Sequence, residues 1–64
     1  MKRKAIWEFE DKYIAEVGGG KCAVFYKDTG TRVLKDFALP FDSIFAHLNG
    51  GGKFCDVEFE SDDD

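Results

Sequence analysis

The stretch PFDSIFAHLNGGGKFCDVEF, which runs from Pro40 to Phe59, predicts a short helix, a glycine turn and a strand. Its first part carries apolar residues at positions i, i+3, i+4 and i+7, which share one face of a helix: Phe41, Ile44, Phe45 and Leu48. After the glycines, apolar and acidic residues alternate, as in a strand with one buried face: Cys55, Val57 and Phe59 against Asp56, Glu58 and Glu60. The rest of the chain must cover the apolar surface of these two elements.

The ends of the helix also have sequence signals. Pro40 suits the position at or before the first turn, and Asp42 or Ser43 is expected to supply the N-cap. Asn49 and Gly50 tolerate the left-handed conformation in which helices often end. We therefore expect the helix over about residues 41–49.

Residues 3–17 admit three interpretations. Aromatic and apolar residues occupy the odd positions from Trp7 to Val17 except at Asp11, with charges at most of the even ones, which is the alternation of a strand. The run forms one long strand with a bulge, or two short strands bent at Glu10-Asp11-Lys12. A helix that ends at Gly18 is the third interpretation. The aromatic enrichment favours strands.

The middle of the chain predicts a β-hairpin. Cys22–Tyr26 is the first strand. Residues 27–31 contain a three-residue hairpin loop with a bulge, in which glycine takes the left-handed position. Residues 32–37 return as the partner strand, which places Phe25 near Val33.

These elements predict an α+β fold: a small, mainly antiparallel sheet of four to five strands with the short helix packed on one face. Residues 1–60 form one domain, and residues 61–64 form an acidic disordered tail. A helix this short covers one face only. Apolar residues on the other face would then need a second subunit, which predicts a homo-oligomer: Ile6, Ile14 and Phe54.

Composition limits the classes of partner. The 64 residues carry a net charge of −4, which argues against nucleic acid, because binding to nucleic acid depends on neutralising phosphates. No apolar run is long enough to span a membrane, and the basic start is not followed by the apolar stretch of a signal peptide. We expect a cytoplasmic protein in which Cys22 and Cys55 are reduced, although a disulfide is conceivable if their strands pair.

No motif predicts catalysis, a metal or a cofactor. The segments Gly18–Lys21 and Gly50–Lys53 resemble phosphate-binding loops only in composition, because neither ends in Lys-Ser or Lys-Thr or leads into a helix. We interpret them as turns; the alternative is a small-molecule or nucleotide sink at subunit boundaries. His47 has no partner at a spacing typical of metal sites or of general-base catalysis.

Two groups of residues are candidates for contacts with other proteins. The acidic end either shields an edge strand or imitates a row of phosphates, because alternate strand residues lie about 6.6–7 Å apart: Asp56, Glu58, Glu60, Asp62, Asp63 and Asp64. Aromatic residues are expected at an oligomer interface, because a core this small does not easily enclose one Trp, two Tyr and seven Phe: Trp7, Tyr13 and Phe54.

The C-terminal half, with residues 41–45, Leu48-Asn49-Gly50, Val57–Glu60 and the acidic end, resembles the small phage and prophage proteins of the YonK-like group. This resemblance implies a small ββ-α-β chain that self-assembles, in a group with no settled activity. It carries no functional residues across. The triple glycine and the aromatic first half depart from the group's pattern.

The sequence therefore leads to a functional hypothesis with two alternatives. The hypothesis is a non-catalytic, phage-encoded module that inhibits or modulates a host protein through its acidic strand and tail or its aromatic patch. The first alternative is a self-assembling structural protein. The second is the small-molecule sink.

Overall fold

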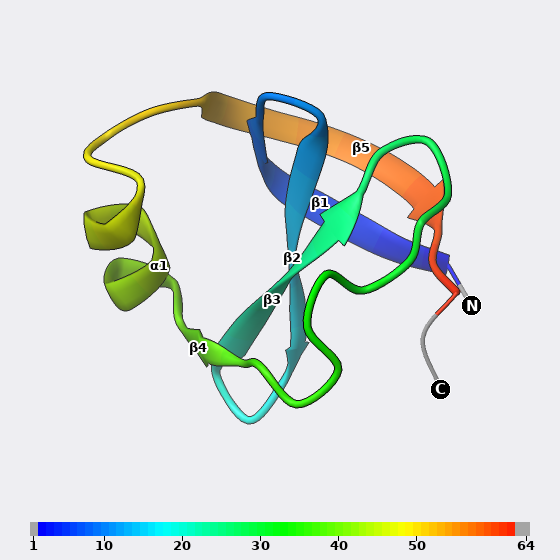
Figure 1. The fold of residues 1–64 in the computed structure, drawn as a ribbon, viewed down its shortest axis with the longest axis horizontal. Helices are drawn as coiled ribbons and strands as arrows, with labels where there is room; N and C mark the ends of the chain where they lie inside the picture. The colour runs from blue at the N-terminus through cyan, green and yellow to red at the C-terminus, as the bar shows by residue number, and fades with distance from the viewer. Residues whose placement is uncertain (1, 63–64) are drawn as a thin grey trace.

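The computed structural model describes residues 2–62 as a five-stranded antiparallel sheet with one short helix (Figure 1). The predicted α+β class is confirmed. The strands lie in the order β4-β3-β2-β1-β5, so the chain runs back and forth through four strands and returns at the other end of the sheet. The elements are β1 (Lys2–Phe9), β2 (Lys12–Gly18), β3 (Lys21–Tyr26), β4 (Leu39–Pro40), α1 (Phe41–His47) and β5 (Lys53–Glu60).

The first half of the chain forms a tight hairpin. β1 and β2 pair with Phe9 opposite Lys12, and residues 10 and 11 form the turn between them. Glu10 adopts a positive φ of 54°, which the two-residue turn requires. Of the three interpretations of residues 3–17, the two strands bent at residues 10–12 are therefore confirmed, and the single strand and the helix are wrong.

The predicted hairpin after β3 is only half correct. The turn forms, because Gly30 adopts a φ of 73° and its N–H donates to the carbonyl of Tyr26 at 2.8 Å. The expected partner strand over residues 32–37 does not form. One bridge joins Phe25 to Arg32, so Phe25 pairs one residue earlier than the predicted Val33.

The chain leaves β3 after this bridge because residues 33–37 form a loop that packs against the sheet. The N–H of Val33 still donates to the carbonyl of Val24 at 2.9 Å, and then the N–H of Phe37 donates back to Leu34 at 3.2 Å. Phe37 packs against the core, and β4 resumes pairing where Leu39 meets Cys22.

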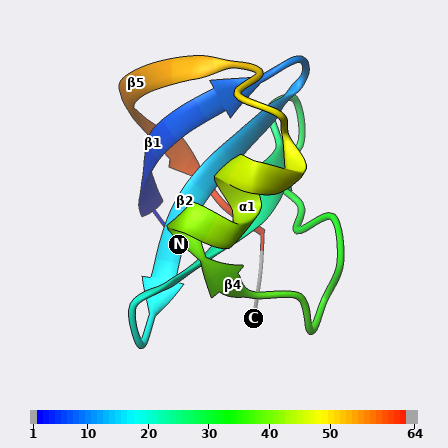
Figure 2. The same ribbon diagram turned by 90° about the vertical axis from the view of Figure 1, so that its left-hand side faces the viewer.

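The helix is shorter than predicted and begins differently. Pro40 occupies the N-cap position with φ −55° and ψ 148°, without a side-chain hydrogen bond, so the predicted caps Asp42 and Ser43 are wrong. Pro40 ends β4, and the chain passes directly from strand to helix. The predicted stop is confirmed by the positive φ of Asn49 (54°) and Gly50 (75°). Ile44 is the buried residue of α1, which lies against β3 and β4 (Figure 2).

The sheet curls strongly around a row of alanines. Ala5 pairs with Ala15, which pairs with Ala23, and all three are fully buried. Small side chains at these positions let the ends of the sheet approach each other. The ring of Phe25 on β3 therefore lies 5.3 Å from the ring of Phe59 on β5, although β2 and β1 separate these strands in the sheet.

The curl covers the face that the helix leaves open, where Phe59 packs against the cluster that contains Phe25. Two predictions are wrong. Ile14, expected on the face away from the helix, lies on the helix side and is fully buried in the cluster beneath α1 together with Trp7 and Ile44. Residues 61 and 62, expected in a disordered tail, belong to the fold: Ser61 is 3% exposed, and the N–H of Asp62 donates to the carbonyl of Gly30 at 2.8 Å. The remaining tail residues, Asp63 and Asp64, lie outside the described residues.

The cysteines lie on strands that do not pair with each other. Cys22 is buried on β3, Cys55 is half-buried on β5, and both thiols are free. Burial raises the pKa of both thiols, with the carboxylates of Glu16 and Glu8 respectively adding to the effect. Since the thiolate is the reactive form, neither residue has the lowered pKa of a nucleophilic cysteine.

Candidate interaction surface

Trp7 is the centre of an aromatic cluster that joins β1, α1 and β5. Its ring lies 5.8 Å from Phe41, 5.0 Å from Phe45 and 4.8 Å from Phe54, each in an edge-to-face arrangement. This geometry is the one that aromatic pairs favour. The indole Nε1–H also donates to the carbonyl of Gly51 at 2.9 Å, which fixes the ring to the loop before β5. Trp7 itself is only 6% exposed.

Two rings of this cluster reach the surface, and we call them the aromatic patch: Phe45 and Phe54. Phe54 is 77% exposed and Phe45 is 37% exposed. The underlying Trp7 contacts both rings, so they are supported from below while their outer faces meet solvent. The patch is therefore apolar, exposed and held in position, a combination that is typical of interaction sites.

An acidic row continues from the aromatic patch along β5. Asp56, Glu58 and Glu60 follow Phe54 at alternate positions, which places them on the same face of the strand. The row is not purely negative, because β1 places Lys4 opposite Glu58 and Lys2 opposite Glu60. The Lys4 ammonium also lies 3.0 Å from the carboxylate of Asp56.

This charge pairing changes the interpretation of the acidic end. Both side chains of the Lys4–Asp56 pair are well exposed, so the pair contributes little to stability. It does place positive charge among the carboxylates, which makes the row less similar to a line of phosphates than the sequence alone indicates. The alternation of Lys2 and Lys4 is the sequence signal for this charge pairing, since it places two positive charges on one face of a strand that could pair with an acidic strand.

The predicted interface residues do not form one surface. Trp7 and Phe54 are in contact, but Trp7 lies in the core. Tyr13 lies on the opposite face of the sheet, where it pairs with Phe25 and its ring lies 5.1 Å from that of Phe59. Phe45, expected on the buried face of the helix, is 37% exposed and packs against the same indole as Phe54.

The other candidate sites are dispersed. The two Gly-Lys segments form turns at opposite ends of the molecule, one between β2 and β3 and the other before β5 (Figures 1 and 2). His47 is exposed in the last turn of α1. Within residues 2–62, no three histidine, cysteine or acidic side chains are placed to hold one metal ion. No helix in the described chain is long and apolar enough to cross a membrane.

Comparisons with protein-family models, curated proteins and solved structures give no match to this chain.

Proposed function

We propose that this protein is a non-catalytic protein-binding module, and that it contacts its partner through the aromatic patch and the acidic row. The observation that carries this proposal is the exposure of Phe54: a phenylalanine that is 77% exposed and packed edge-to-face against a buried tryptophan. The same tryptophan also supports the exposed ring of Phe45, and grouped rather than isolated apolar side chains at a surface mark interaction sites. Aromatic residues are also enriched at protein interfaces.

The packing of Phe54 gives it the properties of a binding anchor. Burying a phenylalanine ring that was exposed contributes about 1.5–3 kcal/mol. Because Trp7 holds the ring at 4.8 Å, little rotamer freedom remains to be lost on binding. Phe45 lies beside the same indole and enlarges the apolar area. These features favour a partner with an apolar pocket for Phe54.

The acidic row indicates what should surround that pocket. Its three carboxylates continue on the face of β5 that also carries Phe54, and Lys2 and Lys4 partly offset them. A partner with arginine or lysine beside its apolar pocket would match this arrangement, and the charges would act mainly on the association rate and on specificity. The resemblance to phage proteins suggests that this partner is a host protein.

Removing the ring of Phe54 is expected to weaken binding strongly. In Phe54→Ser, we expect the affinity for a partner captured on the wild-type protein to fall by about 30-fold or more, as for a central interface residue worth about 2 kcal/mol. The matched control is Val57→Ser, which changes a partly exposed apolar residue of the same strand. Calorimetry with the purified partner measures the affinity of both variants. The charge variant Asp56→Asn/Glu58→Gln should associate more slowly and with a weaker salt dependence, which binding kinetics with the same partner measure. Equal affinities for wild type and Phe54→Ser would contradict the proposal.

Self-assembly through the same patch is the second candidate function, because a second copy would also cover Phe54. It predicts a solution mass that is a multiple of 7.2 kDa and that is insensitive to salt. The curl of the sheet weakens the case for it, because the second face already carries a packed cluster and less apolar surface remains for a second copy to cover.

A further inference from the structure

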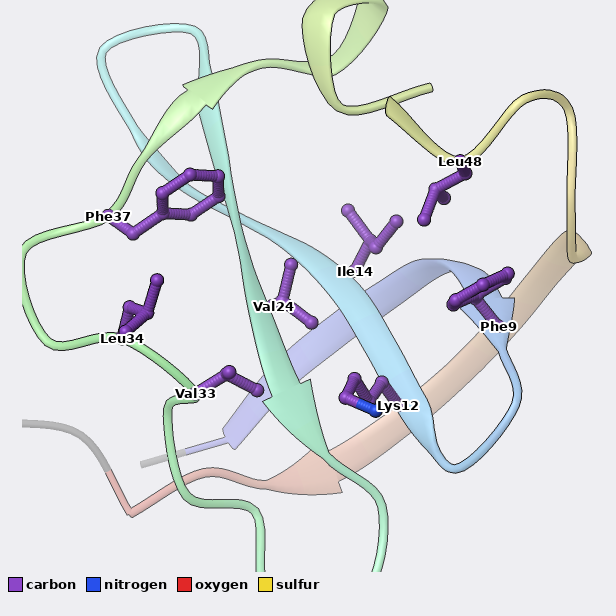
Figure 3. Close-up of a pocket in the computed structure, with 8 residues that line it drawn as sticks. All are labelled: Phe9, Lys12, Ile14, Val24, Val33, Leu34, Phe37 and Leu48. Atoms are coloured by element: carbon purple, nitrogen blue, oxygen red, sulfur yellow. The ribbon is translucent and has the colours of Figure 1, made fainter. Parts of the chain in front are cut away.

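A hollow lies between the sheet and the loop that follows β3, on the side of the sheet that carries Ile14. Its volume is about 240 Å³. Side chains from the first three strands, from the loop after β3 and from the end of the helix point toward the same space (Figure 3). They are Phe9, Lys12, Ile14, Val24, Val33, Leu34, Phe37 and Leu48.

We propose that this hollow binds a small, uncharged, apolar molecule. Apart from Lys12, every lining side chain is aliphatic or aromatic, so the walls offer no side-chain hydrogen bond to an occupant. The hollow is partly open to solvent, and water inside it finds few polar partners, so its displacement by an apolar molecule is favourable. The proposal is independent of the aromatic patch and the acidic row.

Lys12 does not make the hollow a site for an anion. Its ammonium already donates to the carboxylate of Asp11 at 2.9 Å and lies 5.6 Å from the centre of the Tyr26 ring. The aliphatic stem therefore lines the hollow while the charge is satisfied outside it, as is common for lysine. The Lys12 ammonium is already paired with one carboxylate, so a second carboxylate would have to compete for it, and an ammonium inside would find no acceptor among the lining side chains. Either charge would lose part of its hydration against the apolar walls.

The size of the hollow limits the occupant. A cavity of about 150 Å³ with aliphatic and aromatic walls holds benzene, so 240 Å³ suits a molecule of roughly ten non-hydrogen atoms. Sites for drug-sized ligands are larger, at about 300–1,000 Å³. One wall is a loop, in which Leu34 is 59% exposed and Phe37 is tied to the Arg32 guanidinium by a 3.1 Å hydrogen bond from Nη2 to the Phe37 carbonyl. This wall is therefore held in place at Phe37 and open to solvent at Leu34.

Three probes of one shape test the class of ligand: toluene, benzoate and benzylammonium. Each is titrated into the isotope-labelled full chain, and amide chemical shifts are recorded by NMR. We expect toluene to give saturable shift changes at Ile14, Val24 and Leu34. Both charged probes should bind at least about tenfold more weakly, because either charge would lose part of its hydration against the apolar walls. The proposal is overturned if toluene leaves these amides unchanged, or if benzoate binds as tightly as toluene.

Substitutions that fill the hollow provide a second test of whether toluene binds there. Val24→Phe puts a ring into the space and should weaken toluene binding by at least about tenfold. The matched control is Val57→Phe on β5, outside the hollow, which should bind as the wild type does. If Val24→Phe does not fold, Leu34→Ala removes part of the loop wall at an exposed position and should weaken binding several-fold. Unchanged toluene binding in whichever of these variants folds would overturn the proposal.

Discussion

Trp7→Ala is expected to remove a large part of the protein's stability. Replacing a buried tryptophan by alanine costs about 3–5 kcal/mol. A chain of this length has a free energy of unfolding of only roughly 3–10 kcal/mol, at about 0.05–0.15 kcal/mol per residue. Trp7 contacts three phenylalanines from α1 and β5 and bonds the loop at Gly51, so its loss removes the side-chain contacts that join α1 and this loop to the sheet.

Urea denaturation followed by circular dichroism measures this effect. Trp7→Phe is the informative control, because it keeps an aromatic ring but loses the hydrogen bond to Gly51. We expect it to fold with a free energy of unfolding between those of wild type and Trp7→Ala. A cooperative transition in Trp7→Ala with wild-type stability would show that the aromatic cluster does not hold the fold together.

Gly30→Ala is expected to be strongly destabilising. Gly30 has a φ of 73°, which side chains disfavour by about 1–3 kcal/mol. A Cβ at this position would also collide with the carbonyl oxygen of Glu60, which is backbone and cannot move aside without shifting β5. The bond from the Asp62 N–H to the Gly30 carbonyl would then be strained. We expect a total loss of about 3 kcal/mol or more.

Gly19→Ala separates the two causes. Gly19 has a similar φ of 64°, but a Cβ there would meet nothing within 4 Å. It should therefore lose only the backbone contribution, about 1 kcal/mol. Thermal unfolding of both variants measures the difference. If Gly30→Ala lost no more stability than Gly19→Ala, the contact that closes the curled sheet between Gly30 and the end of β5 would not exist in solution.

Local patterns predicted the elements whose residues alternate or repeat clearly. The strand character of residues 3–17, the helix after Pro40 and the last strand all follow from the spacing of apolar residues, and the structure has each of them. The failure at residues 32–37 has a physical cause. Val33 and Phe37 pack as parts of a loop against the sheet, and apolar spacing in so short a run does not distinguish that loop from a strand.

The candidate site depended on contacts between residues that are far apart in the sequence. The exposure of Phe54 was expected, but the position of Trp7 beneath it was not. The pairing of β1 shifts register between Ala5 and Trp7, and the sequence does not show which face of the strand the residues after this shift occupy. The pairing of Lys2 and Lys4 with the acidic strand is equally non-local. The row of buried alanines, which lets the sheet cover its own second face, also becomes visible only when the strands are in register.

Photo-crosslinking from position 54 tests most directly whether the aromatic patch binds another protein. A photoreactive phenylalanine analogue replaces Phe54 in the full chain, and a second protein carries it at the partly exposed Val57 as the control. Both are irradiated in the cells in which the protein is naturally made, and the adducts are identified by mass spectrometry. The account predicts that position 54, and not position 57, forms an adduct with one different protein. Adducts at position 54 with a second copy of this chain alone, or no adducts at all, would contradict it.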